Sequence, residues 1–463
     1  MQKLFDEVGS LDKRCYEAFC LSEDILMEHA ANGMASYIQN NFSKEKKIII
    51  AVGSGNNGAD GIALARLLHG SYDVALYFVK EPKSPMALLQ EKRAKSIGVK
   101  SITTLYECDI LVDAIVGTGF EGTFSQELTQ TLTMLNNAQA VKIACDVPSG
   151  LKRSGECANP TFQADITLTM GALKKSLFLD EAKDFVGNVE VLNLGIDRTL
   201  YERETNYYLL DLQDLQLPTR SHKNSHKGSF GHLSVLSGDK IGASVFSAQA
   251  ALRFGAGLVT LVSHENNSIP FEIMHAYQLP SNTTAIALGM GLGENFSNEE
   301  LQNYLKKDLP LLIDADLFYM PLLLELLKRS KIVLTPHPKE FAALLKMTQL
   351  ANISVTTLQK NRFAYVELFC KHYPNAVLLL KGANVIIGHN DTYYINPHGS
   401  AKLAKGGSGD VLSGLIASLL AQGFSPLNAA INGSLAHTQI ALNYTLSDFS
   451  LTPNDLINGI GNL

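Results

Sequence analysis

The sequence predicts a protein with two α/β domains, each built around its own sheet of mainly parallel strands. Short runs rich in Val, Ile and Leu alternate with longer helical patterns from about Lys47 onwards, and such runs are typical of strands buried on both faces. The chain has 463 residues, which is more than one ordinary core of roughly 100–200 residues requires. We therefore expect two cores.

Composition and charge exclude several classes of function. The formal net charge of −6 gives no electrostatic footprint for nucleic acid or an anionic membrane surface. The N-terminal residues lack the apolar segment of a signal peptide, and the apolar run 411–420 is shorter than the roughly 18 residues of a membrane span. The six cysteines show neither CxxC pairing nor zinc spacing. We therefore expect a soluble, cytoplasmic protein with reduced thiols that binds neither nucleic acid nor membrane.

In the first half of the chain, predicted strands alternate with predicted helices, and this order favours a parallel sheet with helices on both faces. An apolar helical face near the N terminus (Ile25, Leu26, Ala30 and Met34) either pairs subunits or caps this domain, and we favour the cap. The predicted strands are residues 48–52, 73–79, 109–116, 140–145, 164–170 and 189–194, with helices at 62–70, 84–97 and 125–136.

A change of character marks the predicted boundary. Residues 198–227 are polar, contain Pro218 and cluster Arg, Lys and His, so we interpret them as the connection between domains. A second series of strand-like runs follows at once: HLSVLS, LVTLVS, AIAL, LLIDAD, KIVLT and VLLLK. A new sheet needs a new core, so the predicted domains are residues 1–205 and 206–463.

The sharpest local signal in the first half is the glycine-rich segment Gly53–Gly61, GSGNNGADG. It lies between a strand and a helix, where such a turn lets backbone N–H groups approach a phosphate at the helix N-terminus. A tight turn without a ligand is the alternative. The polar side chains of Ser54, Asn56, Asn57 and Asp60 favour a binding site.

Two further polar loops follow strands of the same sheet, at the carboxyl ends where ligands bind in open parallel sheets. Asp113 lies inside an apolar strand and precedes a Gly-Thr-Gly loop, and Asp146 begins the motif DVPSG. A carboxylate in an apolar strand is costly to bury without a cation or hydrogen-bond donors. Asn57, Asp113 and Ser149 offer oxygen ligands that suit a hard cation, and a metal-free hydrogen-bond network is an equal alternative.

These motifs resemble the YjeF N-terminal family, the NAD(P)H-hydrate epimerases, over about residues 20–197. The helical segment LMEHA and Lys174 add to the resemblance. It implies a Rossmann-like three-layer domain that interconverts the R and S forms of NADHX or NADPHX at C6 of the hydrated nicotinamide. Asp146 would then be the acid/base residue at the ring, because a carboxylate can supply the proton transfer that this chemistry needs.

The same resemblance implies a set of ligands. Asn57, Asp113 and Ser149 would hold potassium. Ala59 stands where the family usually has glycine, and its methyl group would narrow the approach to a phosphate if the residue needed a positive φ. The hydrated dinucleotide would be bound by Asn56, Asn57, Gly58, Ala59, Asp60, Gly117, Thr118, Gly119, Phe120, Glu121, Gly122, Thr123 and Asp146.

The motif GGSGD at residues 406–410 concentrates the chemistry of the second half. Its glycines let the backbone turn into a helix whose N-terminal N–H groups can hold an anion. Asp410 lies at the helix start, where it can take a proton from a substrate hydroxyl beside the phosphates. A helix cap is the alternative role, and the segment KGANV together with the glycine run favours catalysis. His337, between two prolines, indicates a rigid turn whose imidazole contacts a ligand.

The second half resembles the ADP/ATP-dependent NAD(P)H-hydrate dehydratases over about residues 206–450. The segments HKGSFGHL, GAS with AALRFGAGLVTL, GMGLG, LTPHPKE, LKGANV and GGSGDVLSG occur in that order. The resemblance implies a ribokinase-like three-layer domain that uses ADP or ATP, with magnesium, to phosphorylate the C6 hydroxyl, after which elimination of phosphate restores NAD(P)H. Ala243, Gly293, His337 and Asp410 would contact NAD(P)HX, and the adenine nucleotide would contact Lys381, Gly382, Ala383, Asn384, Val385 and Gly409.

Departures from this second pattern are mild. Met290 replaces a usual proline, Lys339 a glycine, and Ser408 a threonine whose hydroxyl it keeps. Lys405 replaces a small residue and adds a positive charge next to the phosphate loop.

Together the two resemblances imply an epimerase fused to a dehydratase, because the first half would supply the stereoisomer that the second consumes. We expect NADHX or NADPHX and an adenine nucleotide as partners, and a homo-oligomer. One alternative is a hydroxymethylpyrimidine- or sugar-type kinase with a nucleotide-binding N-terminal module. Another is a first half that binds nucleotide without catalysis.

Overall fold

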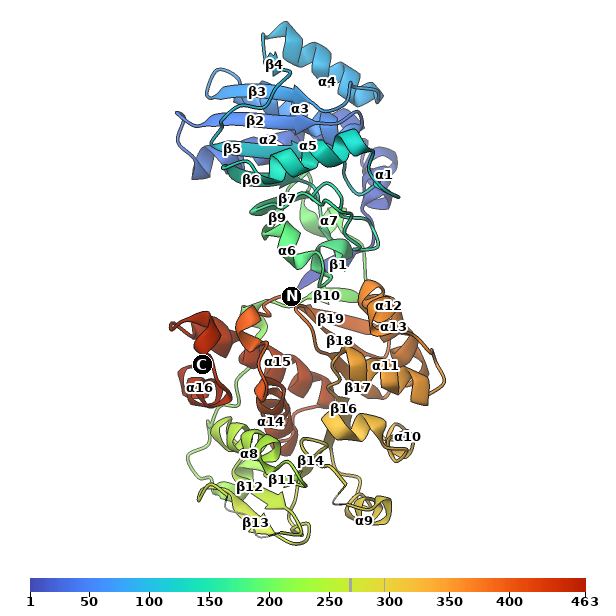
Figure 1. The fold of residues 1–463 in the computed structure, drawn as a ribbon, viewed down its shortest axis with the longest axis vertical. Helices are drawn as coiled ribbons and strands as arrows, with labels where there is room; N and C mark the ends of the chain where they lie inside the picture. Colours follow the sequence, from blue (N-terminus) through green and yellow to red (C-terminus); the bar gives the residue numbers. More distant parts are fainter. Residues whose placement is uncertain (266–268, 295) are drawn as a thin grey trace. The chain divides into compact units, whose positions relative to one another are not determined.

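The computed structural model describes residues 1–265, 269–294 and 296–463, and it divides into two compact units. One unit is Gln2–Thr205, and the other is Asn206–Leu463 with Met1. Each unit combines a mainly parallel sheet with helices, so the predicted α/β class is confirmed (Figure 1). No helix of the described residues is both long enough and apolar enough to cross a membrane.

The first unit, whose residues are all described, is built on a parallel sheet with strand order β4-β3-β2-β5-β6-β7-β9. Its central strands hold almost entirely buried side chains, which explains their near-continuous apolar sequences. The strands are β2 (Lys47–Val52), β3 (Asp73–Phe78), β4 (Lys100–Ile102), β5 (Ile110–Ala114), β6 (Val141–Cys145), β7 (Ile166–Met170) and β9 (Asn188–Leu192).

Helices cover both faces of this sheet (Figure 1). Alternate residues of a strand point to opposite faces, so Ile48 and Ile50 pack with α2 and α3, whereas Ile49 and Ala51 pack with α5. The first unit is therefore a three-layer domain, as predicted. Its longer helices are α1 (Gly9–Ala18), α2 (Glu23–Asn41), α3 (Asn56–Leu68), α4 (Pro85–Ser96) and α5 (Gln126–Asn136).

The apolar face of α2 packs inside the first unit. Leu26, Ala30 and Met34 are buried there, and only Ile25 of the predicted face is exposed. Because this face is buried within the first unit, the prediction that it caps the domain is confirmed, and it is not free to pair subunits. The sequence analysis did not predict α1, which precedes α2, or the short parallel pair of β1 (Gln2–Phe5) with β8 (Leu173–Lys174).

The polar stretch 198–227 is not a simple connection, which corrects the prediction. The helix α7 (Arg198–Tyr201) belongs to the first unit, where Tyr201 is buried. The strand β10 (Tyr207–Leu209) already pairs with β19 (Thr392–Asn396) of the second unit. Two tyrosines of β10 stack on tyrosines of β19, and these contacts hold the start of the second unit against its sheet.

In the described part of the second unit, neighbouring strands from β13 to β17 pair in parallel in the order β13-β12-β11-β14-β15-β16-β17. The next strand, β18, is antiparallel to both β17 and β19. The strands are β11 (His232–Leu236), β12 (Leu258–Val262), β13 (Met274–Ala276), β14 (Ala285–Leu288), β15 (Leu311–Ile313), β16 (Ile332–Leu334), β17 (Ala376–Leu380) and β18 (Val385–His389).

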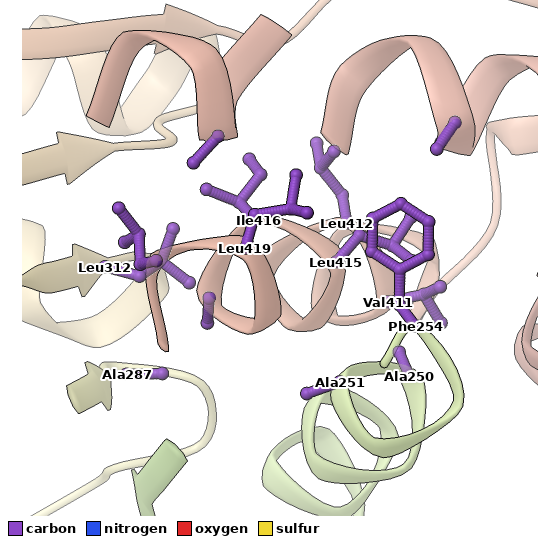
Figure 2. Packing of buried hydrophobic residues seen from close by; sticks show 14 of the residues in the cluster. Ala250, Ala251, Phe254, Ala287, Leu312, Val411, Leu412, Leu415, Ile416 and Leu419 are labelled. Carbon is purple, nitrogen blue, oxygen red and sulfur yellow. The ribbon is translucent and has the colours of Figure 1, made fainter. Parts of the chain in front are cut away.

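One face of this sheet is covered by α8 (Ile241–Arg253), α14 (Ser408–Ala421) and α15 (Pro426–Asn443). Figure 2 shows apolar residues of α14 between the sheet, represented by Leu312, and the alanines of α8. A Cβ at Gly414 would lie 2.3 Å from the Ser247 carbonyl oxygen, so the two helices approach closely.

The opposite face is covered by α13 (Arg362–His372). A Cβ at Gly388 of β18 would lie 2.6 Å from the Cys370 sulfur of α13, whereas the adjacent Ile387 packs in the core beneath α14 and α15. The second unit therefore also has three layers.

Candidate active sites

A cavity of about 620 Å³ opens at the carboxyl ends of the strands of the first unit. The loops after β2, β5 and β6 and the end of β7 form one wall, and residues of α1 and α2 form the other. This volume is in the range of small-molecule sites. Three of the predicted motifs therefore converge on one hollow.

Glycines bring the first motif against the second. A Cβ at Gly53 would lie 1.9 Å from the Ile115 carbonyl oxygen, and a Cβ at Gly58 would lie 2.0 Å from the Gly53 carbonyl oxygen. No side chain fits at either position. The close approach places Asn56 and Asp60, in the first turns of α3, at the cavity wall.

Ala59 does not narrow this approach. It lies within α3, outside the residues that adopt a positive φ. Its side chain is fully buried beside Met27, Met86 and Ala87 and does not line the cavity. The condition under which the methyl group would obstruct a phosphate is therefore not met.

Asp146 and Lys174 form an ion pair at the cavity. The Lys174 ammonium, whose side chain is 1% exposed, donates to Asp146 Oδ1 at 2.6 Å and to Thr169 Oγ1 at 2.8 Å. The Met170 amide donates to the same carboxylate oxygen at 3.0 Å. Asp146 has a φ of +70°, a strained conformation for a residue with a side chain. This backbone and these donors fix the direction of the carboxylate.

Two further carboxyl groups line the cavity, from Asp12 and Asp60. Burial raises the pKa of Asp60 well above its usual range, and the charge of Asp146 adds to the rise. Burial also raises the pKa of Asp12, while a 2.7 Å hydrogen bond from the Tyr201 hydroxyl opposes the rise. The sequence analysis singled out Asp60 and missed Asp12. The spacing of the buried Leu11 and Cys15 indicates the helix α1 but not a role for Asp12 on it.

The three predicted cation ligands gather around the loop that follows β5. Asp113 is fully buried, and its two oxygens accept from the hydroxyl and the amide of Ser149 at 2.6 and 2.7 Å. Burial raises the pKa of Asp113 to about 6, and the hydrogen bonds from Ser149 oppose the rise. The Ser149 hydroxyl accepts from the Val116 amide at 3.0 Å.

Asn57 reaches the same loop, because a Cβ on the neighbouring Gly117 would lie 3.5 Å from Asn57 Oδ1. The buried Asn57 Nδ2 has no hydrogen-bond partner among the described residues. Since the oxygen and nitrogen of an amide are exchanged by a rotation of its plane, this position can present an oxygen to a cation. An orphaned amide against the loop that follows the buried Asp113 fits an oxygen-ligated ion. The part of the chain described here has no cluster of three His, Cys, Asp or Glu.

Most of the predicted dinucleotide ligands line the cavity, and four do not. Gly58 and Ala59 lie inside α3, and Gly122 and Thr123 lie further along their loop. The lining residues are Asn56, Asn57, Asp60, Gly117, Thr118, Gly119, Phe120, Glu121 and Asp146.

In the second unit, Lys381 and Asp314 join the ends of β17 and β15. The Lys381 ammonium lies 2.7 and 3.0 Å from the two oxygens of Asp314, which is almost fully buried. The Ser413 hydroxyl of α14 donates to Asp314 at 2.6 Å. A Cβ at Gly409 would lie 3.3 Å from the Lys381 ammonium nitrogen. The glycine turn and the lysine therefore meet, as the sequence motifs predicted.

Asp410 lies in the first turn of α14, directly after this turn. The helix is capped by Gly407 at a φ of +88°, without a side-chain cap, so the alternative role of Asp410 as a helix cap is wrong. Burial raises the pKa of Asp410 to about 6, with Asp314 and Asp316 adding to the rise and Lys381 opposing it. No described residue donates a hydrogen bond to its carboxylate, which suits a proton acceptor.

His337 forms the cap of α11 (Pro338–Met347). Its Nδ1 accepts from the amides of Lys339 and Glu340 at 3.1 and 3.3 Å, and its Nε2 lies 3.2 Å from a Glu340 oxygen. Nε2 therefore bears the proton of the neutral ring. Burial and the charge of Lys381 lower the pKa of His337, and the side chain remains 45% exposed. These contacts hold the imidazole in the turn that precedes α11.

The remaining predicted residues are spread around this centre. Ala243 lies in the first turn of α8, and the Gly293 amide donates to Asp316 at 3.0 Å. Residues 382–384 connect β17 to β18, and Val385 begins β18. Lys405 donates to the Phe449 carbonyl at 2.7 Å, so its charge is engaged there.

The sequence analysis gave no role to Asp314 or His437. Asp314 ends an apolar strand, which is the signal that identified Asp113. His437 is buried in α15, with Nε2 at 3.2 Å from the Ser408 hydroxyl, and burial lowers its pKa to about 4. His437 gives no signal comparable to that of Asp314, because a single histidine within a helix does not indicate a site.

Comparisons with known proteins agree with both motif sets. A family model described as "YjeF-related protein N-terminus" matches residues 23–176, and one described as "NAD(P)H-hydrate dehydratase" matches residues 233–461. The ADP/ATP-dependent NAD(P)H-hydrate dehydratase of Bacillus subtilis, co-crystallised with ATP and magnesium, is 28% identical with a TM-score of 0.46. That match covers 54% of this chain and 94% of the other.

Full-length relatives combine both halves. The bifunctional NAD(P)H-hydrate repair enzyme Nnr of Helicobacter pylori is 43% identical, and the match covers 100% of both chains. The enzyme of the same name from Escherichia coli is 31% identical over 93% of this chain and 87% of its own length. The chain therefore belongs to the family of bifunctional NAD(P)H-hydrate repair enzymes.

Proposed function

We propose that this chain repairs hydrated nicotinamide nucleotides in two steps. The first unit interconverts the R and S forms of NAD(P)HX at C6, and the second dehydrates the S form to NAD(P)H at the expense of ADP or ATP. The observation that supports this most is that each unit has its own carboxylate–lysine centre, Asp146 with Lys174 and Asp410 beside Lys381. Hydration produces both epimers, and a chiral dehydratase site consumes only one.

In the first step, Asp146 is the acid/base residue at the nicotinamide ring. Its fixed orientation and its position in the cavity support this role. The loop Gly117–Glu121 and the start of α3 bind the dinucleotide, with helical N–H groups available to a phosphate. Asn57, Asp113 and Ser149 hold potassium, and the bound ion supplies the positive charge that compensates the buried Asp113 carboxylate.

In the second step, Asp410 takes the proton of the C6 hydroxyl as the oxygen attacks the terminal phosphorus of the nucleotide. Its pKa of about 6 leaves it ionised at neutral pH. Lys381 and the N-terminal N–H groups of α14 bind the phosphates, and the segment 382–385 with Gly409 contacts the rest of the nucleotide. Magnesium, bound with the nucleotide, supplies neutralising charge at the phosphates.

Ala243, Gly293 and His337 complete the NAD(P)HX site of the second unit. The resulting phosphate ester at C6 has a good leaving group. Loss of phosphate, with loss of a proton from the adjacent carbon, restores the double bond of NAD(P)H.

As part of the proposal, the enzyme works in the cytoplasm and associates with copies of itself. All six cysteines are free thiols, which supports a reducing compartment. Met274 and Tyr277 are exposed at β13, where the described sheet ends in an unpaired edge, and this supports self-association. Cell fractionation and light scattering test the two statements.

The experiment that tests the second step replaces Asp410 by Asn. Nucleotide-dependent repair of S-NADHX should fall by at least about 10²-fold, while ADP binding measured by calorimetry stays within about threefold. Asp308→Asn, at an exposed aspartate of the same unit, is the matched control and should retain full activity. Loss of ADP binding in Asp410→Asn would assign Asp410 a structural role instead.

A further inference from the structure

A second proton-transfer residue lies in the wall of the cavity that α1 provides. Asp12, from α1, and Asp146, from the loop after β6, both line the cavity. Leu11 and Cys15, on either side of it, are buried and anchor the helix. The Arg14 guanidinium donates to the carbonyl oxygens of α7, among them that of Tyr201 at 2.6 Å. The helix α1 is therefore a fixed part of the site.

Tyr201 connects Asp12 to the Asp146 side of the cavity. Its side chain is 1% exposed, and its hydroxyl donates to Asp12 Oδ1 at 2.7 Å. Its ring packs on Gly171, which has a φ of +72° and at which a Cβ would lie 2.6 Å from the ring. Gly171 directly follows Met170, whose amide donates to Asp146. One packed chain of residues therefore sets Asp12 relative to Asp146.

Interconversion of two epimers requires proton transfer at both faces of the reacting carbon. The hydroxyl must leave C6 from one face with a proton, and water must add to the other face and lose a proton. One carboxylate reaches one face. Asp146, paired with Lys174, serves one face, and the cavity requires another group for the second.

We propose, on the basis of the epimerase function above, that Asp12 is the second proton-transfer residue and that Tyr201 positions it. The Asp12 carboxyl gives its proton to the C6 hydroxyl as the C6–O bond breaks, and the N1 lone pair forms an N1=C6 double bond. Water adds to the opposite face, N1 recovers its lone pair, and Asp146 takes the proton from that water. Asp146 then releases its proton to solvent and Asp12 takes one from solvent, and the reverse reaction exchanges the two roles.

The groups around Asp12 suit a proton donor. Burial raises its pKa, and the charges of Asp146 and Glu7 add to the rise, while the Tyr201 hydroxyl and Lys174 lower it. Tyr16 of the same helix and Asp60 of α3 also face this part of the cavity. An acid that must be protonated gives a rate that falls as pH rises through its pKa. Asp12 therefore produces the alkaline limb of the epimerisation profile.

The test measures conversion of purified R-NADHX to the S form, without nucleotide, by chromatography of the epimers. Asp12→Asn should lower kcat by at least about 10²-fold with KM within about threefold, and should lose the alkaline limb. Glu17→Gln, at an exposed position of the same helix, should behave as wild type. Nucleotide-dependent repair of S-NADHX reports that the second unit is intact, and the first transition in urea unfolding reports whether the first unit of each variant is folded.

Tyr201→Phe keeps the Asp12 carboxyl and tests the proposal even if Asp12→Asn unfolds. Removing the hydroxyl removes a hydrogen bond that lowers the pKa of Asp12, so the alkaline limb should move to higher pH. An Asp12→Asn rate within about threefold of wild type, or an unmoved limb in Tyr201→Phe, would overturn the inference and leave the epimerase function standing. Absence of epimerisation in the wild type would overturn both.

Discussion

Among single residues, Lys174 has the most informative environment in the first unit. A buried ammonium without a partner costs several kcal/mol, so its burial indicates that the contact with Asp146 is obligatory. The lysine also donates to Thr169 and to the Met170 carbonyl oxygen. It therefore holds the strand end and the carboxylate together.

Replacing Lys174 by Gln should lower kcat for epimerisation by about 10²-fold, because Asp146 loses the charge and the donor that orient it. The free energy of unfolding of the first transition in urea should fall by about 3 kcal/mol, since one partner of a buried pair is left alone. Chromatography of the epimers measures the rate. Lys13→Gln, at an exposed lysine of α1, is the control, and equal rates in both variants would contradict the assignment.

Asp410 gives a pH prediction for the second unit. As a proton acceptor it must be ionised, and its pKa of about 6 means that kcat/KM for nucleotide-dependent dehydration should fall about tenfold per pH unit below pH 6. Asp314 and Asp316 raise this pKa and Lys381 lowers it. The acidic limb of the pH profile therefore reports on the charges around Asp410. Initial rates with S-NADHX, ADP and magnesium in a constant-ionic-strength buffer measure it. A profile that stays flat down to pH 5 would contradict the role of Asp410.

Potassium should stabilise the first unit through Asp113. An ion that binds only the folded state stabilises by about 2.7 kcal/mol at one hundred times its dissociation constant. Thermal unfolding in KCl should therefore occur at a higher temperature than in tetramethylammonium chloride of equal ionic strength. Asp113→Asn should lose this difference while Asp109→Asn, at the exposed end of the same sheet, keeps it. A salt difference that survives in Asp113→Asn would place the ion elsewhere.

Site residues that are charged within an otherwise apolar strand pattern were predictable from the sequence. Asp113 lies in an apolar strand and Asp146 follows one, and a carboxylate buried there needs a cation or hydrogen-bond donors. Asp12 was missed because its partner, Tyr201, lies 189 positions away and neither residue is unusual in its own segment. The pairing of Lys381 with Asp314 was missed because the two residues are 67 positions apart, although Asp314 itself follows an apolar strand.

At the scale of elements, the helix α3 begins earlier than predicted. Asn56–Gly61 were expected in a glycine-rich turn between the strand and the helix, whereas the structure includes them in α3. Tertiary packing explains the difference. A Cβ at Gly61 would lie 2.6 Å from the Ala114 side chain, so the helix start is pressed against β5 and needs small residues.

Two neighbouring substitutions in α3 should both lower stability but differ in their effect on epimerisation. Gly58→Ala should abolish epimerisation and lower the free energy of unfolding by about 1–3 kcal/mol, because its Cβ would meet the Gly53 carbonyl oxygen at 2.0 Å. Ala59→Gly should cost about 1 kcal/mol through lost helix propensity and leave KM for NADHX within about twofold. Urea unfolding and steady-state rates measure both. A large rise in KM for Ala59→Gly would contradict the position of Ala59 away from the cavity.

Most strands were predicted to within a few residues, because buried parallel strands have continuous apolar sequences. The short elements β1, β4, β8 and α7 were not, since two to four residues contain no period to detect. The contributions of residues 198–227 to the two units were missed in the same way. Polar residues surround α7 and β10, which conceals the buried Tyr201 of α7 and the two stacked tyrosines of β10.

At the scale of the whole molecule, each of the two sets of sequence motifs belongs to one unit with its own core and its own carboxylate–lysine centre. A net charge of −6 cannot attract anionic nucleotides, so each unit must bind phosphates locally, through glycine turns, helix N-termini and a lysine. The class of each domain followed from its order of strands and helices. The pairing of two activities followed only from the motifs, because a fold does not determine a reaction.

The central claim is that the two units act in sequence on one substrate pool. Recovery of reduced-nicotinamide absorbance from a mixed R/S NADHX pool, on adding the enzyme with ADP and magnesium, tests it most directly. The wild type should restore the whole pool, whereas Asp146→Asn should stop at the S fraction and continue only at the slow spontaneous rate. Adding Asp410→Asn protein, whose first unit is intact, should restore complete recovery. No recovery with either ADP or ATP would contradict the account and favour a small-molecule kinase.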